Sequence, residues 1–337
     1  MRLLVFFCIL LMSFLNARAE GSYVPMEISD NLYVIINPQG GNIAFLVTRK
    51  GVIVIDSGST PSNGEQIVAG IKSVTKKPIK YLILTHLHGD HTNGISAFPN
   101  DVEIIAHNKL EKNYHQFNSP NIAHYKEKLL PTHLASLKEE MDAAQETDSL
   151  KYANLVENYN KNIDYLENIK RIEFRTPNIT FEDYYLLKLG GERIVLEYVG
   201  PGHTNDNIVV KFSNHNIIHT GDLIFDGVFP YLITEHGVDV YNWIKILDDL
   251  YKENILTVIP GHGDVRRKIV LKYQSDYFKD LSQKIEKLSE EGYSLEEIKR
   301  KIDPKDFDLH GNEEQLPVNI EVIYTELINK GDRWWEF

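Results

Sequence analysis

Short runs of apolar residues, each bounded by Gly, Pro or Asn, recur along the first part of the chain. They occupy residues 31–36, 42–48, 52–55 and 81–84. β-branched residues dominate them, which predicts strands. Between the last two runs, Ile67, Val68 and Ile71 have helical spacing, so residues 63–72 are expected to form the helix of a β-α-β unit.

The pattern changes from about residue 109 to 170. This stretch contains no Gly, and Lys, Glu and Asn alternate with apolar residues three or four positions apart, such as Leu134, Leu137 and Met141. This spacing predicts an amphipathic helical hairpin inserted into the fold. We expect it near the mouth of any site that the preceding strands form, as a lid, a homodimer contact or a plain surface addition.

Strand-like runs return in the second half of the chain, which repeats the β-rich character of the first. They occupy residues 184–189, 193–199, 208–212, 217–219 and 255–259. The tail, about 266–337, is charged and helical in pattern, with candidate helices at 277–288 and 295–302. We expect residues 20–337 to form a single domain.

The N-terminal segment has the parts of a secretory signal peptide. Arg2 precedes an apolar run over residues 3–15, and Ala17-Arg18-Ala19 supplies a small-residue cleavage site. The alternative is a membrane anchor, but the run is shorter than the roughly 20 residues of a spanning helix. We expect residues 1–19 to be removed, and the protein to be periplasmic or secreted without stable membrane insertion.

The composition of the chain excludes cysteine chemistry and argues against a nucleic-acid partner. The only cysteine, Cys8, lies within the predicted signal peptide, so the mature chain would have no disulfide, no thiolate ligand and no cysteine nucleophile. Lys and Arg total 36 against 48 Asp and Glu, a formal charge of -12. An acidic surface repels phosphate backbones, so we expect a small-molecule substrate and no nucleic-acid partner.

Four potential metal ligands follow the strand at 81–84 within six positions. They are His86, His88, Asp90 and His91. His86 and His88 are two residues apart at a strand end and can point the same way, whereas Asp90 and His91 can turn towards a second ion. The motif therefore predicts a site for two metals.

Three later strands end in glycine followed by a residue of ligand type. These endings are Gly202-His203, Gly221-Asp222 and Gly261-His262. Glycine permits the tight turns that bring side chains into a small volume, so we expect the three residues to join the same site. His219 is expected to be buried structure. The remaining histidines lack neighbours of ligand type at useful spacing, and surface or capping roles are expected for them: His107, His115, His124, His133, His215, His236 and His310.

With these motifs in order, the chain resembles the metallo-β-lactamase superfamily over most of residues 31–264. The resemblance implies an α+β fold, a four-layer αββα sandwich, here with a helical insertion and C-terminal helices. It also implies two Zn²⁺ ions per chain. The carried-over ligands are His86, His88 and His203 for the first zinc, Asp90, His91 and His262 for the second, and Asp222 as the bridge between them. Asp56 matches an early Asp of the family that orders the site from behind.

The resemblance implies a hydrolase that cleaves a small ester, lactone or lactam with a hydroxide held between two zinc ions, and Asp90 could orient that hydroxide. Residues 200–210 look like the secreted β-lactamases. His91 and Asp222 instead look like thioesterases, lactonases and phosphodiesterases, where the best-known lactamase subclass has Arg and Cys. Iron suits the same ligands, so a persulfide dioxygenase-like activity is the alternative, as is a phosphodiesterase. No substrate-binding residue is predicted. The aromatic residues of 225–231 are expected either in the core or as a substrate wall.

Overall fold

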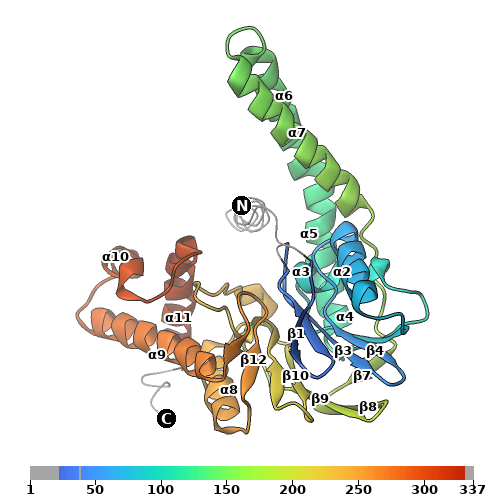
Figure 1. Cartoon of the computed structure of the whole chain (residues 1–337). Coiled ribbons are helices and arrows are strands. Elements are labelled where there is room, and N and C mark those ends of the chain that lie inside the picture. The colour runs from blue at the N-terminus through green and yellow to red at the C-terminus, as the bar shows by residue number, and fades with distance from the viewer. Residues whose placement is uncertain (1–22, 38, 331–337) are drawn as a thin grey trace.

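Two β-sheets pack face to face in the computed structural model, which describes residues 23–37 and 39–330. Helices cover the outer face of each sheet (Figure 1). The predicted signal peptide lies outside the described residues. Within the described ranges, the structure contains no helix long and apolar enough to cross a membrane.

The first sheet contains seven strands in the order of the chain. They are β1 (Met26–Ser29), β2 (Leu32–Ile35), β3 (Ile43–Thr48), β4 (Gly51–Ile55), β5 (Ile79–Ile83), β6 (Glu103–His107) and β7 (Ile179–Phe181). The pairs from β1 to β4 are antiparallel, and those from β4 to β7 are parallel. Parallel pairs need crossover connections. Helix α2 (Pro61–Val74), capped by Thr60, supplies the one between β4 and β5.

The second sheet contains six strands. They are β8 (Tyr184–Leu189), β9 (Glu192–Tyr198), β10 (Ile208–Phe212), β11 (Ile217–His219), β12 (Thr257–Ile259) and β13 (Arg266–Arg267). Their order is β13-β12-β11-β10-β9-β8, and only β11 and β12 run parallel. The crossover between these two contains α8 (Val240–Lys252). The two sheets therefore share the plan of antiparallel strands followed by a β-α-β unit.

Alternate side chains of each strand enter the cores on opposite faces of its sheet, and this arrangement gives the fold its layers. In β3, Ala44 and Leu46 contribute to the core between the sheets, whereas Ile43 and Phe45 contribute to the core under α2. Successive side chains of a strand point to opposite faces, so each sheet is buried on both sides. A third core joins the second sheet to α8, α9 (Ile269–Glu290), α10 (Leu295–Lys301) and α11 (Leu316–Lys330). The expected four-layer αββα sandwich is confirmed.

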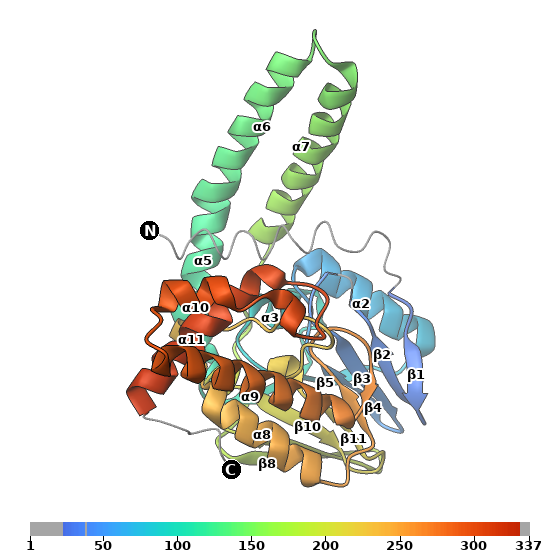
Figure 2. The same cartoon turned by 90° about the vertical axis from the view of Figure 1, so that its left-hand side faces the viewer.

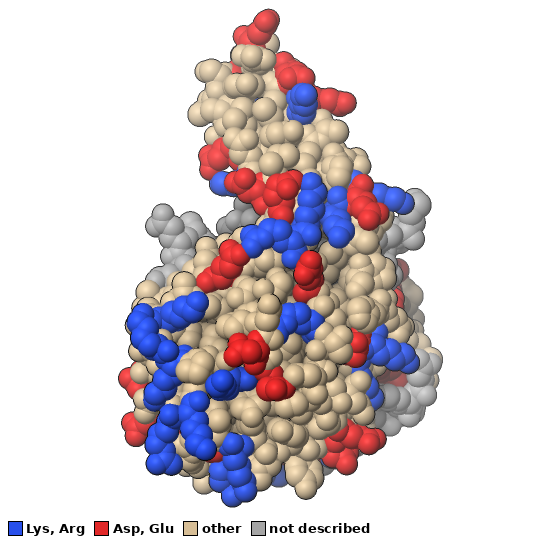
Figure 3. All heavy atoms as spheres, turned by 90° about the vertical axis from the view of Figure 1, so that its right-hand side faces the viewer, with Lys and Arg blue, Asp and Glu red and all other residues tan. Residues whose placement is uncertain are grey.

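The insertion between β6 and β7 is helical, as predicted. It runs through α4 (Leu110–Asn113), α5 (Ser119–His124) and two π-helical turns into α6 (Leu130–Ala144), and returns along α7 (Ser149–Lys170). Helices α6 and α7 form a hairpin that stands away from the sandwich (Figures 1 and 2). On the face in Figure 3, charges of both signs gather at the hairpin base, and much of its upper surface is uncharged.

The cap of α8 provides a test of the second half of the fold. Asp239 Oδ1 accepts a hydrogen bond of 2.9 Å from the backbone N–H of Asn242 at the first turn. Asp239→Ala removes this acceptor, so the free energy of unfolding should fall by about 1 kcal/mol in urea titrations. Asp249→Ala, an exposed change on the same helix, should cost less than about 0.5 kcal/mol. Equal effects would contradict the capping role.

Candidate metal centre

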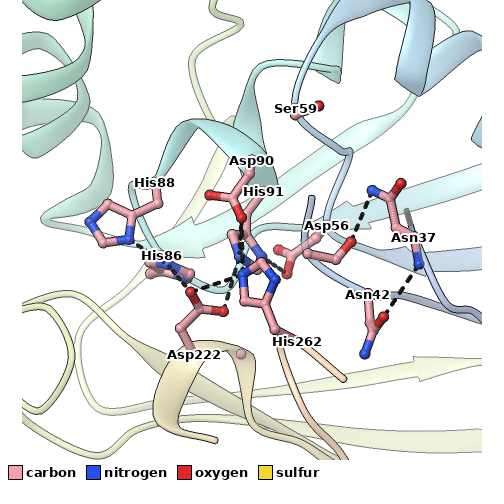
Figure 4. A network of polar contacts seen from close by, with 12 residues as sticks. Asn37, Asn42, Asp56, Ser59, His86, His88, Asp90, His91, Asp222 and His262 are labelled. Atoms are coloured by element: carbon pink, nitrogen blue, oxygen red, sulfur yellow. Dashed lines mark hydrogen bonds and ion pairs between the residues drawn. The ribbon is translucent and has the colours of Figure 1, made fainter. Parts of the chain in front are cut away.

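All seven predicted ligands lie where strands end, at one edge of the sandwich. His86 and His88 follow β5, and Asp90 and His91 lie in the short helix α3 (Gly89–Thr92). The second sheet contributes the others: His203 after β9, Asp222 after β11 and His262 after β12. Figure 4 shows the side chains of both halves converging on the carboxylate of Asp222.

The first group of ligand atoms surrounds one point. His88 Nδ1 lies 3.1 Å from His86 Nε2 and 2.8 Å from His203 Nε2. Asp222 Oδ2 lies 3.8 Å from the former and 3.5 Å from the latter nitrogen. These four residues offer ligand atoms that lie within 4.8 Å of one another, and all four are buried.

The second group shares the carboxylate of Asp222 with the first. His91 Nε2 lies 3.1 Å from Asp222 Oδ1 and 3.4 Å from Asp90 Oδ2. His262 Nε2 lies 3.0 Å from Asp90 Oδ2 and 3.3 Å from Asp222 Oδ2. Asp222 is the only residue common to the two groups, which is the position that a bridging ligand requires.

Hydrogen bonds at the back of each ring fix the tautomers. His203 Nδ1 donates to the carbonyl of Tyr231 at 3.0 Å, and His86 Nδ1 to the hydroxyl of Thr85 at 3.0 Å. His88 Nε2 lies 2.7 Å from His236 Nδ1, and the His88 tautomer whose Nδ1 faces the site as an acceptor donates its N–H to that nitrogen. In the neutral rings, the nitrogens that face one another are therefore unprotonated and present only lone pairs.

This donor set fits a metal. Zinc–nitrogen bonds of about 2.0–2.1 Å place the ligand atoms of a tetrahedral site roughly 3.3 Å apart, and the distances above cluster around that value. Among the described residues, His91 Nε2 and Asp222 Oδ1 are buried and lie 3.1 Å apart, but neither makes a hydrogen bond of good geometry. A bound cation would satisfy both atoms.

The pKa values divide the histidines into two kinds. Burial, with neighbouring imidazoles, holds the pKa of His86 and His88 well below its usual range, and burial lowers that of His203 to about 4. Burial opposes charge on His91 and His262 as well. Nearby carboxylates outweigh it, raising the pKa of His91 well above normal and that of His262 to about 9. The carboxylates of Asp90 and Asp222 thus concentrate negative charge around the second ligand group.

Asp56 lies behind the second group, where the sequence places it. Its side chain is fully buried, and Oδ2 accepts hydrogen bonds from His91 Nδ1 at 2.7 Å and from the Thr85 hydroxyl at 2.9 Å. Oδ1 accepts from the Thr85 backbone N–H at 2.8 Å. Asp56 therefore holds rings of both ligand groups, His91 directly and His86 through Thr85.

Close backbone approaches join the two halves at the site. The N–H of Asn42 donates to the carbonyl of Gly261 at 2.7 Å, and its side chain donates to Pro260 and Gly263. A Cβ at Gly261 would overlap the Asp222 carboxylate, and one at Gly41 would overlap the His91 ring. These contacts fix the His262 loop against the first sheet.

Two histidines that the sequence assigned to surface or capping roles are buried, so that prediction was wrong for them. His236 is 4% exposed and contacts His88, and His107 is 1% exposed and stacks on Tyr198 at 4.0 Å. Sequence reasoning missed His236 because its partner at the site, His88, lies 148 positions away in the chain. His219 is buried as expected, and His310 is exposed.

The aromatic loop after Asp222 divides between the two expected roles. Phe225 stacks on the His262 ring at 5.5 Å, and Tyr231 lines the cavity above the ligands. Phe229 packs on Tyr277 in the core. The loop therefore supplies both a wall of the site and part of its foundation.

Comparison with known proteins agrees with this geometry. The model of the metallo-β-lactamase superfamily matches residues 36–262. The chain belongs to the metallo-β-lactamase superfamily. Relatives in this superfamily are metal-dependent hydrolases, and we assign this chain to the same class of enzyme.

Individual relatives are distant. A type 2 metallo-β-lactamase of Bacillus sp. (strain 170) is 23% identical over 236 residues, 69% of this chain and 71% of that protein. A sec-alkylsulfatase structure from Pseudomonas sp. has a TM-score of 0.66 at 15% identity and covers 92% of this chain, which spans about half (51%) of that one. A metallo-β-lactamase structure from Pontibacter korlensis has a TM-score of 0.51 at 19% identity, over 75% of this chain and 96% of that one. The structural likenesses show a shared fold.

The contact between His88 and His236 can be tested directly. His236→Ala removes the acceptor that orients the His88 ring, so affinity for a divalent metal should fall by roughly 10–100-fold in competition with a chromophoric chelator. In His236→Asn, the asparagine Oδ1 can replace the lost nitrogen as an acceptor, so this variant should recover part of the metal affinity. The exposed His310→Ala is the control and should bind as the unaltered protein does. Equal affinity in all variants would contradict the orienting role.

Proposed function

We propose that this protein is a dinuclear zinc hydrolase that cleaves a small ester, lactone or lactam outside the cytoplasm. The observation that carries the proposal is the pair of four-residue ligand groups that share Asp222. Histidine and carboxylate donors with no thiolate suit two zinc ions. The proposed location rests on the signal-like sequence of residues 1–19.

When bound, zinc ions supply a nucleophilic hydroxide near neutral pH and polarise a carbonyl oxygen. The chain's own residues position the reactants. The side chain of Asp90 is 26% exposed, more than His91 or Asp222, and lies on the cavity wall. Its carboxylate can accept a hydrogen bond from an attacking water and orient it towards the scissile carbonyl.

Other side chains keep this geometry rigid. Asp56 and Thr85 fix ligand rings of the first half, and the Tyr231 carbonyl fixes that of His203. Groups held this way need no reorganisation during the reaction, which is a main source of enzymatic rate enhancement. Asp56 and Thr85 thus act through His91 and His86 and need not touch the substrate.

Two observations favour ester and lactone substrates over lactams. Asp222 is positioned as a carboxylate bridge, and His91 belongs to the second ligand group. The residues at these two positions are the ones in which the sequence resembles lactonases and phosphodiesterases. The structural similarity to a sec-alkylsulfatase also extends over more of the chain than that to the lactamase, so a sulfate ester belongs among the compounds tested.

Elemental analysis tests the bridge. The protein reconstituted with zinc should contain two ions per chain, and Asp222→Ala should contain no more than one, because the second group loses its shared ligand. Asp249→Ala, on the outer face of α8, is the matched control and should keep both ions. Two tightly bound ions in the Asp222 variant would refute the bridging role.

Metal removal tests the reaction class. Chelation should abolish hydrolysis, and zinc should restore it. Initial rates would be measured on a panel of esters, lactones, thioesters, β-lactams, phosphodiesters and sulfate esters. We expect the ester or lactone to react fastest. Activity that survives chelation, or that iron restores and zinc does not, would refute the zinc assignment and favour the iron-dependent alternative.

A further inference from the structure

The cavity above the ligands extends far beyond them. It has a volume of about 880 Å³, and its floor contains His88, Asp90, Asp222 and His262. The helical insertion forms a large part of its wall, from Asn118 in the first π-helical turn to Ile172 after α7. The insertion was expected at the mouth of the site, and the lining places it there.

The lining of the cavity extends along α7. Lining residues recur along this helix from Asn154 to Ile169, a distance of about 22 Å at 1.5 Å per residue. Asn154, Asn158 and Asn162 are four apart and therefore lie on one face of the helix. The hairpin rises from the edge of the sandwich that carries α3 (Figures 1 and 2). A ligand with its reacting group at the floor could extend along this face.

The lining near the hairpin base contains a group of apolar and aromatic side chains. Ile169 and Tyr125 are buried, Tyr165 packs against the same cluster, and Ile122 also lines the cavity. The rings of Tyr125 and Tyr165 lie 6.0 Å apart, edge to face. Towards the hairpin tip the α7 lining becomes rich in asparagine amides. The wall therefore offers apolar contact first and amide hydrogen bonding further out.

Cationic side chains are scarce along this wall. Among the described residues that line the cavity, Lys161 is the only Lys or Arg, and its Nζ pairs with Glu157 at 2.6 Å. Asp164 adds a further carboxylate to the α7 lining. An anionic group on a bound chain would therefore find no uncompensated lysine or arginine away from the metal ligands. A neutral chain carries no such cost.

We propose that the substrate is an elongated ester or lactone without an anionic group in its chain, and that this chain lies along the α7 face of the insertion, with its apolar part against Tyr125, Tyr165 and Ile169. This inference rests on the proposed function for the identity of the reacting group. The shape and charge inferred for the substrate's chain rest on the cavity alone. This inference disfavours compact substrates that carry a carboxylate away from the metals.

A binding experiment tests how the substrate's chain fits the cavity without requiring any reaction. Calorimetry with methyl ketones of increasing chain length should show at least about tenfold tighter binding of the dodecyl than of the propyl compound, because buried methylene groups each add affinity. Asn158→Trp fills the cavity wall and should remove most of this gain. Asn160→Trp is the matched control: the same change on the same helix, at an exposed residue outside the lining. Equal affinity for all chain lengths, or equal effects of the two variants, would overturn the proposal.

Hydrolysis separates this inference from the proposed function. For para-nitrophenyl esters, kcat/KM should rise at least about tenfold from the acetyl to the octanoyl ester. It should fall again for a chain of the same length that ends in a carboxylate. Ester hydrolysis without these dependences would overturn the inference alone. Length-dependent ketone binding without hydrolysis of any ester would support the cavity assignment and refute the proposed ester chemistry.

Discussion

The structure depends on one electrostatic constraint: several buried lone pairs must face the same small volume. Each imidazole of the first ligand group donates its N–H to a partner on the side away from the site. The Tyr231 carbonyl and the Thr85 hydroxyl are two of these partners. The nitrogens that remain cannot satisfy one another, because an acceptor gains nothing from another acceptor. Such an arrangement is stable only when the surrounding protein holds it in place or a cation occupies its centre.

The surrounding protein holds it through the contact between its two halves. Each sheet contributes ligands at its edge, and Asn42 joins the first sheet to the loop of His262. The side-chain core between the sheets fixes the distance between these edges, because packed interiors have little compressibility. The two halves must therefore dock before either ligand group is complete. A metal that binds the complete groups would in turn stabilise the docked state.

Much of the fold could be predicted from the sequence because short apolar runs bounded by turn residues are a local signal. Strands β3, β8 and β10 lie where those runs placed them. Strands β1, β6, β7 and β13 were not predicted. Of these, β7 and β13 have only three and two residues, and such short runs carry no period. Helix α8 was missed although its buried residues have helical spacing. Helix α9 begins at Ile269, eight residues before the predicted start.

The site was predictable to the extent that its residues are adjacent in sequence. The spacing of His86, His88, Asp90 and His91 identifies them as a group, and glycine turns identify the three later positions. His236 was not predictable, because its only relation to the site is a contact with a residue 148 positions away. The cavity wall was also unpredictable in detail. A hairpin can be inferred from periodicity, but the direction in which it projects depends on its tertiary contacts.

The insertion also has a topological position of interest, since it is the crossover that every pair of parallel strands requires, here between β6 and β7. None of the seven ligand positions lies within it. A crossover of this kind can lengthen, shorten or be exchanged without altering strand register or the residues that hold the metals. The chain thus separates the parts that define its chemistry from the part that lines the outer cavity, and the two can diversify independently during evolution.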